Sequence, residues 1–190
     1  MSEFTIHTLQ SAPEASHEAL GALQKNIGFI PNLAGTIAGS ATALQGFVSM
    51  QSSLRGSSLT PVEREVVGIT VSLENTCEYS MAAHSTFALA QGAAIEMVAA
   101  LRAGDELPDA RLEALRAFTS ELLSERGHLP AAQVSAFLQA GYSEASVLEV
   151  ITQVAYTTFA NLVANIADTP VDEAFAPQAW TAASPSPAAS

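Results

Sequence analysis

The sequence predicts an all-α protein, a helical bundle of eight to ten helices. Three observations support this prediction. Apolar residues recur at helical spacing in several segments, no convincing alternating strand pattern or hairpin turn occurs, and Pro, Gly and capping residues divide the chain into helix-sized pieces. Hydrophobic residues make up 48% of the 190 residues, which is enough to bury a core and keep most of the chain ordered.

The sequence divides into three parts. Residues 1–30 are expected to form an N-terminal extension with one helix, over 13–26. The main helical domain is expected over 31–175, and it begins with two short helices within 32–54 that break near Gly39. Residues 176–190 end in small residues and prolines, so we expect a disordered tail.

Two consecutive helix starts follow. Thr60 has the pattern of an N-cap, and Glu63 three residues later completes a capping box. Asn75 and Glu78 repeat the spacing and predict a second start, with Gly92 closing that helix after Gln91.

Four further helices complete the expected bundle, over 94–103, 109–126, 130–139 and 144–167. The last is the longest, and Ser143 can cap it. Its periodic apolar residues are expected to be core positions: Val147, Ile151, Val154, Phe159, Leu162 and Ile166.

Charge and targeting signals narrow the class of protein. Seven basic and nineteen acidic residues give a net charge of −12, which disfavours binding to nucleic acid or to an anionic membrane. The N-terminus lacks a signal-peptide pattern, and no uninterrupted apolar run approaches the roughly 18 residues of a membrane span. We therefore expect a soluble cytoplasmic protein.

One segment carries candidate chemistry. Cys77, Ser80 and His84 have i, i+3 and i+7 spacing, so they share one helix face. Glu65 borders the apolar stripe of the preceding helix, and an antiparallel hairpin of the two helices could bring it towards His84. A half-buried carboxylate beside an imidazole is suited to proton exchange.

Simpler interpretations of these residues stay open at this point. A lone cysteine is commonly a small buried hydrophobe, and a histidine on a half-apolar face is commonly a satisfied polar group. Cys77 is the only cysteine, so no intramolecular disulfide is possible. The four scattered histidines give no metal-ligand spacing, and we expect neither a metal nor another cofactor.

The motif Glu65–x11–Cys77-Glu78-Tyr79-Ser80–x3–His84 resembles the alkylhydroperoxidase D-like, carboxymuconolactone decarboxylase superfamily. The superfamily pattern is Glu–x11–Cys-x-x-Cys–x3–His, and the resemblance covers about residues 30–175. It implies an all-α bundle that assembles into homotrimers or homohexamers. It also implies a hydroperoxide substrate and a dithiol reductant as partners of the peroxidase-type members.

The resemblance implies a role for each catalytic candidate. Cys77 takes the place of the resolving cysteine and position 80 that of the attacking cysteine. His84 and Glu65 take the places of the proton relay. Tyr79 stands where the best-studied type of member has histidine.

The chain departs from the superfamily pattern at Ser80. A serine hydroxyl can form neither a sulfenic acid nor a disulfide, so the predicted function is a peroxidase-like antioxidant protein that is impaired as written. Two explanations stay open: a serine engineered in place of a natural cysteine, or a natural loss of the second thiol.

Two other functions compete with this prediction. The first is a carboxymuconolactone decarboxylase-like lyase, which would need His84 and Glu65 but no dithiol. The second is a non-catalytic oligomeric member. Asn161, in a superfamily-like segment near the end, is expected to be a buried hydrogen-bonding residue rather than a catalyst.

Overall fold

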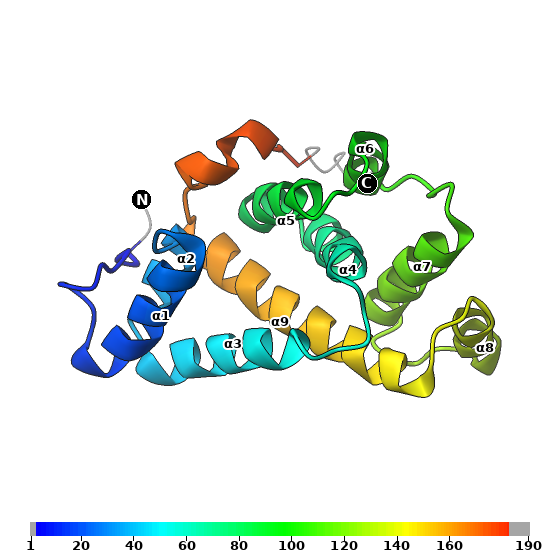
Figure 1. The fold of residues 1–190 in the computed structure, drawn as a ribbon, viewed down its shortest axis with the longest axis horizontal. Helices are drawn as coiled ribbons and strands as arrows, with labels where there is room; N and C mark the ends of the chain where they lie inside the picture. The colour runs from blue at the N-terminus through cyan, green and yellow to red at the C-terminus, as the bar shows by residue number, and fades with distance from the viewer. Residues whose placement is uncertain (1–2, 183–190) are drawn as a thin grey trace, which may run out of the picture.

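The computed structural model describes residues 3–182 and shows an all-helical fold in that part of the chain (Figure 1). Nine α-helices and two short 3-10 helices occur there, in agreement with the predicted eight to ten helices. Their bounds are η1 Glu14–Ser16, α1 His17–Ile27, α2 Asn32–Ile37, α3 Ala41–Leu54, α4 Pro61–Glu74, α5 Glu78–Ala90, α6 Ile95–Ala103, α7 Ala110–Ser124, α8 Ala131–Gln139, α9 Glu144–Ala167 and η2 Glu173–Gln178.

Local capping chemistry fixes several helix starts. The Thr60 side chain accepts from the Glu63 N–H, and the Glu63 carboxylate accepts from the Thr60 N–H, which forms the predicted capping box of α4. Asp109 caps α7 through two backbone N–H groups, and Ser143 caps α9. These starts lie where the sequence predicted them.

The start of α5 differs from the prediction. Asn75 closes α4, because its N–H donates to the Val71 and Leu73 carbonyls of that helix, and its side chain donates to Asn161 instead of capping α5. Thr76 then adopts a left-handed conformation, with φ of 48°, and Cys77 is the N-cap of α5. The second helix therefore begins two residues later than expected.

Helices α4 and α5 occupy the middle of the molecule (Figure 1). The helices α1–α3 lie on one side, α7 and α8 lie on the other, and α9 runs diagonally past both. Two hydrophobic clusters fill the interior. The first joins α2, α3 and the C-terminal half of α9 to one face of α5, and the second joins α4, α6, α7 and α8 to the opposite face.

Three of the six expected core positions of α9 are right and three are wrong. Val147, Val154 and Phe159 are partly buried against the hydrophobic clusters. Ile151 is 42% exposed, Leu162 is 61% exposed and Ile166 is 72% exposed. The buried face is offset and carries small or polar side chains: Ser146, Val150, Gln153, Thr157, Ala160, Asn161, Ala164 and Ala167. Small side chains permit the close approach of α9 to α4 and α5, and Ile151, Leu162 and Ile166 lie outside that contact.

The C-terminal segment also departs from the expected disorder. Helix η2 arches over α5 (Figure 1), and Arg102 donates to the carbonyls of Gln178 and Ala179. Trp180 packs against the second hydrophobic cluster. Residues 176–182 are therefore tied to the helical domain, and the rest of the expected tail, 183–190, lies outside the described residues.

Helix α9 is long and apolar enough, by length and composition, to cross a membrane, and 33% of its apolar window is buried inside the fold. A core helix of a globular domain meets the same criterion, so this property alone identifies no membrane segment.

Candidate active site

A histidine–carboxylate pair lies between α4 and α5. Nδ1 of His84 lies 2.7 Å from Oε2 of Glu65. The side chains are 11% and 16% exposed, so water screens the pair only partly. An ionised carboxylate only accepts hydrogen bonds, so Nδ1 of His84 carries the donated proton. In the neutral ring Nε2 is then the basic nitrogen, which is the arrangement of an oriented general base.

Gly68 makes room for this pair, and the sequence analysis missed it. A Cβ at Gly68 would lie 2.5 Å from Nδ1 of His84, too close for two nonbonded atoms. The missing side chain therefore lets the imidazole lie against the α4 backbone. The available signal was a glycine inside a capped helix, three residues after Glu65, where it costs about 1 kcal/mol relative to alanine.

Ser80 faces an apolar cavity of about 70 Å³ beside His84. Ser80 is 3% exposed, and its hydroxyl has no hydrogen-bond partner among the described residues. The remaining wall is mostly aliphatic and aromatic, formed by Leu23, Ile27, Pro31, Leu33, Ala34, Phe47, Gln51, Tyr79, Ala83, Phe87, Tyr156, Ala160 and Phe175. A free hydroxyl and an imidazole in an apolar wall are the features of a small-ligand site.

Cys77 does not line this cavity within the described part of the chain. Its thiol is fully buried and lies 3.9 Å from the Asn161 carbonyl oxygen, to which it donates. Asn161 is itself buried and accepts from the Asn75 side chain, as expected for a hydrogen-bonding residue. Cys77 therefore lies beneath the site, one helical turn before Ser80.

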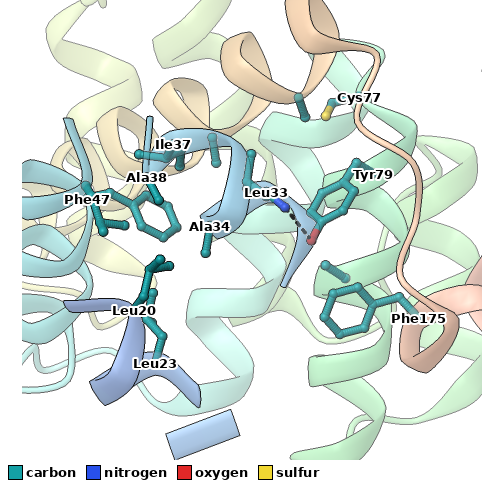
Figure 2. Close-up of a cluster of buried hydrophobic side chains, with 14 of the residues drawn as sticks. Leu20, Leu23, Leu33, Ala34, Ile37, Ala38, Phe47, Cys77, Tyr79 and Phe175 are labelled. Atoms are coloured by element: carbon teal, nitrogen blue, oxygen red, sulfur yellow. Dashed lines mark hydrogen bonds between the residues drawn. The ribbon is translucent and has the colours of Figure 1, made fainter. Parts of the chain in front are cut away.

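Tyr79 is anchored away from the Glu65–His84 pair. Its hydroxyl donates to Oδ2 of Asp172 at 2.6 Å and accepts from the Leu33 N–H at 3.3 Å (Figure 2). Burial and the Asp172 carboxylate raise the pKa of Tyr79 well above its usual range, so the hydroxyl stays protonated. Its ring meets Phe175 edge-on, which ties the C-terminal segment over the cavity.

A second cavity of about 260 Å³ adjoins the Glu65–His84 pair and is more polar. Arg55 at the end of α3 and Arg64 of α4 line it, together with Gln51, Gln91 and Gln153. Arg64 adjoins Glu65 in the sequence, whereas no motif pointed to Arg55. Arg55 is distant in the chain from the motif and reaches the site only because α3 packs along α9.

Neither a metal site nor a larger cavity adds to this arrangement within the described residues. No group of three or more His, Cys, Asp or Glu residues in the described range could hold a metal ion. A larger cavity of about 600 Å³ lies near Thr76, Glu78 and Asp168, but neither Ser80 nor His84 lines it. The candidate chemistry therefore concentrates at the two cavities that meet at His84.

Comparison with known proteins agrees with this architecture. Residues 41–121, which contain Glu65, Cys77 and His84, match the Carboxymuconolactone decarboxylase family. A search of curated proteins finds no significant match.

Solved structures extend the similarity to nearly the whole chain, at identities that show the fold alone. An alkylhydroperoxidase AhpD core protein from Ralstonia eutropha JMP134, described as peroxidase-related, has a TM-score of 0.81 at 20% identity, covering 92% of this chain and 94% of that one. A peroxidase-related protein from Silicibacter sp. TM1040 has a TM-score of 0.78 at 18% identity, with coverages of 91% and 92%.

The debrominase Bmp8, solved as a cysteine-to-alanine variant with 2,3,4-tribromopyrrole, has a TM-score of 0.78 at 16% identity, with coverages of 94% and 96%. The fold therefore accompanies more than one described activity. Together, the family match over residues 41–121 and the shared fold support the resemblance to the alkylhydroperoxidase D-like, carboxymuconolactone decarboxylase superfamily.

Proposed function

We propose that the site is of the thiol-dependent, hydroperoxide-reducing type and that its dithiol cycle is interrupted at Ser80. The observation that carries the proposal is the 2.7 Å Glu65–His84 pair, whose imidazole lines the same cavity as Ser80. Cys77 lies one turn earlier in the same helix, at the resolving position. The site thus has its proton relay and one of the two thiols.

The reaction assigns a task to each position. A thiolate at position 80 attacks a hydroperoxide oxygen, the O–O bond breaks, an alcohol leaves and a sulfenic acid forms. The Cys77 thiol attacks that sulfur, water leaves, and a disulfide forms that an external dithiol reduces by exchange. The Glu65–His84 pair takes the first thiol proton and returns a proton to the departing alkoxide. Ser80 cannot perform the first step.

Restoring the thiol tests the proposal directly. We expect Ser80→Cys to consume tert-butyl hydroperoxide with dithiothreitol as reductant, and to form a disulfide with Cys77 that intact-mass measurement detects. The chain with Ser80 should show no such turnover. Ser80→Cys combined with Cys77→Ala should instead stop at a sulfenic acid, which dimedone traps.

The companion substitution His84→Ala, placed in the Ser80→Cys background, should lower the rate of thiol oxidation. If Ser80→Cys is folded but neither turns over peroxide nor forms the disulfide, the peroxidase proposal is wrong. Turnover by the Ser80 chain itself would equally contradict the interruption at this position.

A lyase activity is the second candidate, and one observation favours it. The Glu65–His84 pair is complete, whereas the thiol pair is not. Proton transfer on a small carboxylated lactone would use this pair alone. Decarboxylation that survives Cys77→Ala and disappears in His84→Ala would support the lyase, and the absence of both reactions would leave the non-catalytic alternative.

We also infer that the chain associates with copies of itself through the outward face of α9. Leu148, Ile151, Leu162 and Ile166 are all more than two-fifths exposed along this helix. Such an apolar stripe is costly in water, and a second copy offers a matching stripe. Light scattering after size exclusion should show a trimer or hexamer, and the paired substitutions Leu162→Glu and Ile166→Glu should yield monomers.

A further inference from the structure

The apolar cavity at Ser80 and the polar cavity at Glu65 are neighbouring compartments around His84. The described residues that line both are Ile27, Gln51, His84, Phe87 and Tyr156. Their volumes are about 70 Å³ and 260 Å³. A ligand that spans both would have one apolar end beside Ser80 and one polar end beside Glu65.

The charges at the polar end favour an anion. The titratable and charged residues that line this cavity are Arg55, Arg64, Glu65, His84 and Tyr156. Glu65 is already paired with His84. Arg64 uses one nitrogen, Nη1, on the Leu59 carbonyl, and the Arg55 guanidinium has no hydrogen-bond partner in the part of the chain that the structure describes. Two guanidinium groups therefore have unused donors at one cavity.

This positive cavity stands out from the rest of the chain. The net charge is −12 and only seven residues are basic. Arg111 and Arg116 are ion-paired with Glu63 and Glu113, and Arg102 donates to carbonyls of the C-terminal segment. Two of the few cations thus line one cavity at the candidate site, where they can attract an anion that the remaining surface repels.

We propose that the two cavities together bind a short-chain carboxylate, with its anion held by Arg55 and Arg64 and its apolar chain lying in the cavity at Ser80. Guanidinium groups suit this task because their donors match the two oxygens of a carboxylate. The inference rests on the proposed function only in taking this cavity as the substrate site. For the hydroperoxide reaction it specifies a hydroperoxide that also carries a carboxylate.

Isosteric probes separate the charge from the apolar chain. Isothermal titration calorimetry at low salt should give hexanoate about tenfold higher affinity than hexanamide, which has the same shape without the charge. Raising the salt concentration should reduce this preference, since the arginines are partly open to water. Shortening hexanoate to butanoate should weaken binding about fourfold for each methylene that leaves the cavity.

Substitutions then test which residues bind each end of the ligand. Arg55→Gln and Arg64→Gln should each lower hexanoate affinity several-fold, and together they should remove its preference over hexanamide. Arg126→Gln is the matched control, because it makes the same charge change at an exposed position at the far end of α7. Ala83→Val narrows the apolar cavity and should weaken hexanoate and hexanamide alike.

Equal affinity for the two probes, or a preference that survives the double arginine substitution, would overturn the proposal. So would an effect of Arg126→Gln as large as that of Arg55→Gln. These are binding measurements on the chain as it stands, so they can fail while Ser80→Cys turns over peroxide, or succeed while it does not.

Discussion

Two glutamates of α4, Glu63 and Glu65, lie two residues apart and have opposite surroundings. Glu63 is buried, and its carboxylate accepts from the Thr60 N–H at 2.8 Å, the Tyr142 hydroxyl at 2.9 Å and Nε of Arg111 at 3.0 Å. Within the described part of the chain, the Glu65 carboxylate has one hydrogen-bond partner, His84, and it borders a cavity. The Glu63 carboxylate is saturated with hydrogen bonds from the fold, whereas the Glu65 carboxylate can still take part in proton transfer through His84.

The difference separates a structural carboxylate from a functional one. Burial raises the pKa of Glu63, but its hydrogen bonds from Thr60, Tyr142 and Arg111 outweigh that effect and leave the pKa below its usual value. Such a group stays ionised and holds α4, α7 and the start of α9 together. A carboxylate with a single imidazole partner instead orients a base. Substituting Glu65 should therefore affect activity, whereas substituting Glu63 should affect stability.

Removing the Glu65 charge should have the largest effect, and it should fall on activity. In the Ser80→Cys background, Glu65→Gln should slow hydroperoxide reduction by about 10²- to 10⁴-fold, the usual contribution of a positioned acid–base group. Unfolding free energy should change little, because Glu65 is partly open to the cavity. Peroxide consumption measures activity, and urea unfolding measures stability. Equal activity with Glu65 and with Glu65→Gln would show that Glu65 is not part of the proton relay.

Removing the Glu63 charge should affect stability instead. Glu63→Gln keeps the shape but weakens the bonds to Arg111, Tyr142 and Thr60, and we expect a loss of about 2–3 kcal/mol in unfolding free energy. Hydroperoxide reduction in the Ser80→Cys background should persist while the chain stays folded. A large loss of activity in folded Glu63→Gln would mean that the two carboxylates are not separate in function.

Gly68→Ala tests how the geometry of the functional pair is maintained. The added Cβ would meet the His84 ring at 2.5 Å, so we expect the imidazole to move from Glu65, with about 1–3 kcal/mol of overpacking. The ¹⁵N signal of Nδ1 of His84 should report the lost contact. Gly46→Ala in α3 is the control, because nothing lies within 4 Å of its Cβ and alanine favours the helix.

The same contrast explains what the sequence could predict. Thr60, Asp109 and Ser143 cap helices through contacts within a few residues, so their pattern is local and readable. The buried face of α9 depends on how closely α4 and α5 approach, and both faces of this helix carry apolar residues. Periodicity alone therefore chose some exposed positions, such as Ile166, along with positions that pack against the core, such as Val154.

The candidate site shows the same limit. Glu65 and His84 meet because they belong to consecutive helices, which the spacing already indicated. Arg55 joins them from a helix that lies earlier in the chain, and no sequence pattern links it to the motif. The burial of the Cys77 thiol also depends on tertiary packing, because the thiol lies against α9. Contacts between distant segments are what the sequence could not supply.

Acid titration should produce the smallest effect and isolate the structural glutamate. Because the pKa of Glu63 is lower in the folded chain, its contribution is fully present above the unfolded value, about 4.3, and is lost as the pH falls through the folded pKa. The gap in unfolding free energy between the unsubstituted chain and Glu63→Gln should therefore narrow below about pH 4. Glu113 has a lowered pKa as well, so only this difference isolates Glu63. A gap that widens in acid would show that Glu63 is protonated in the folded chain, and that the hydrogen bonds around it do not favour its charge.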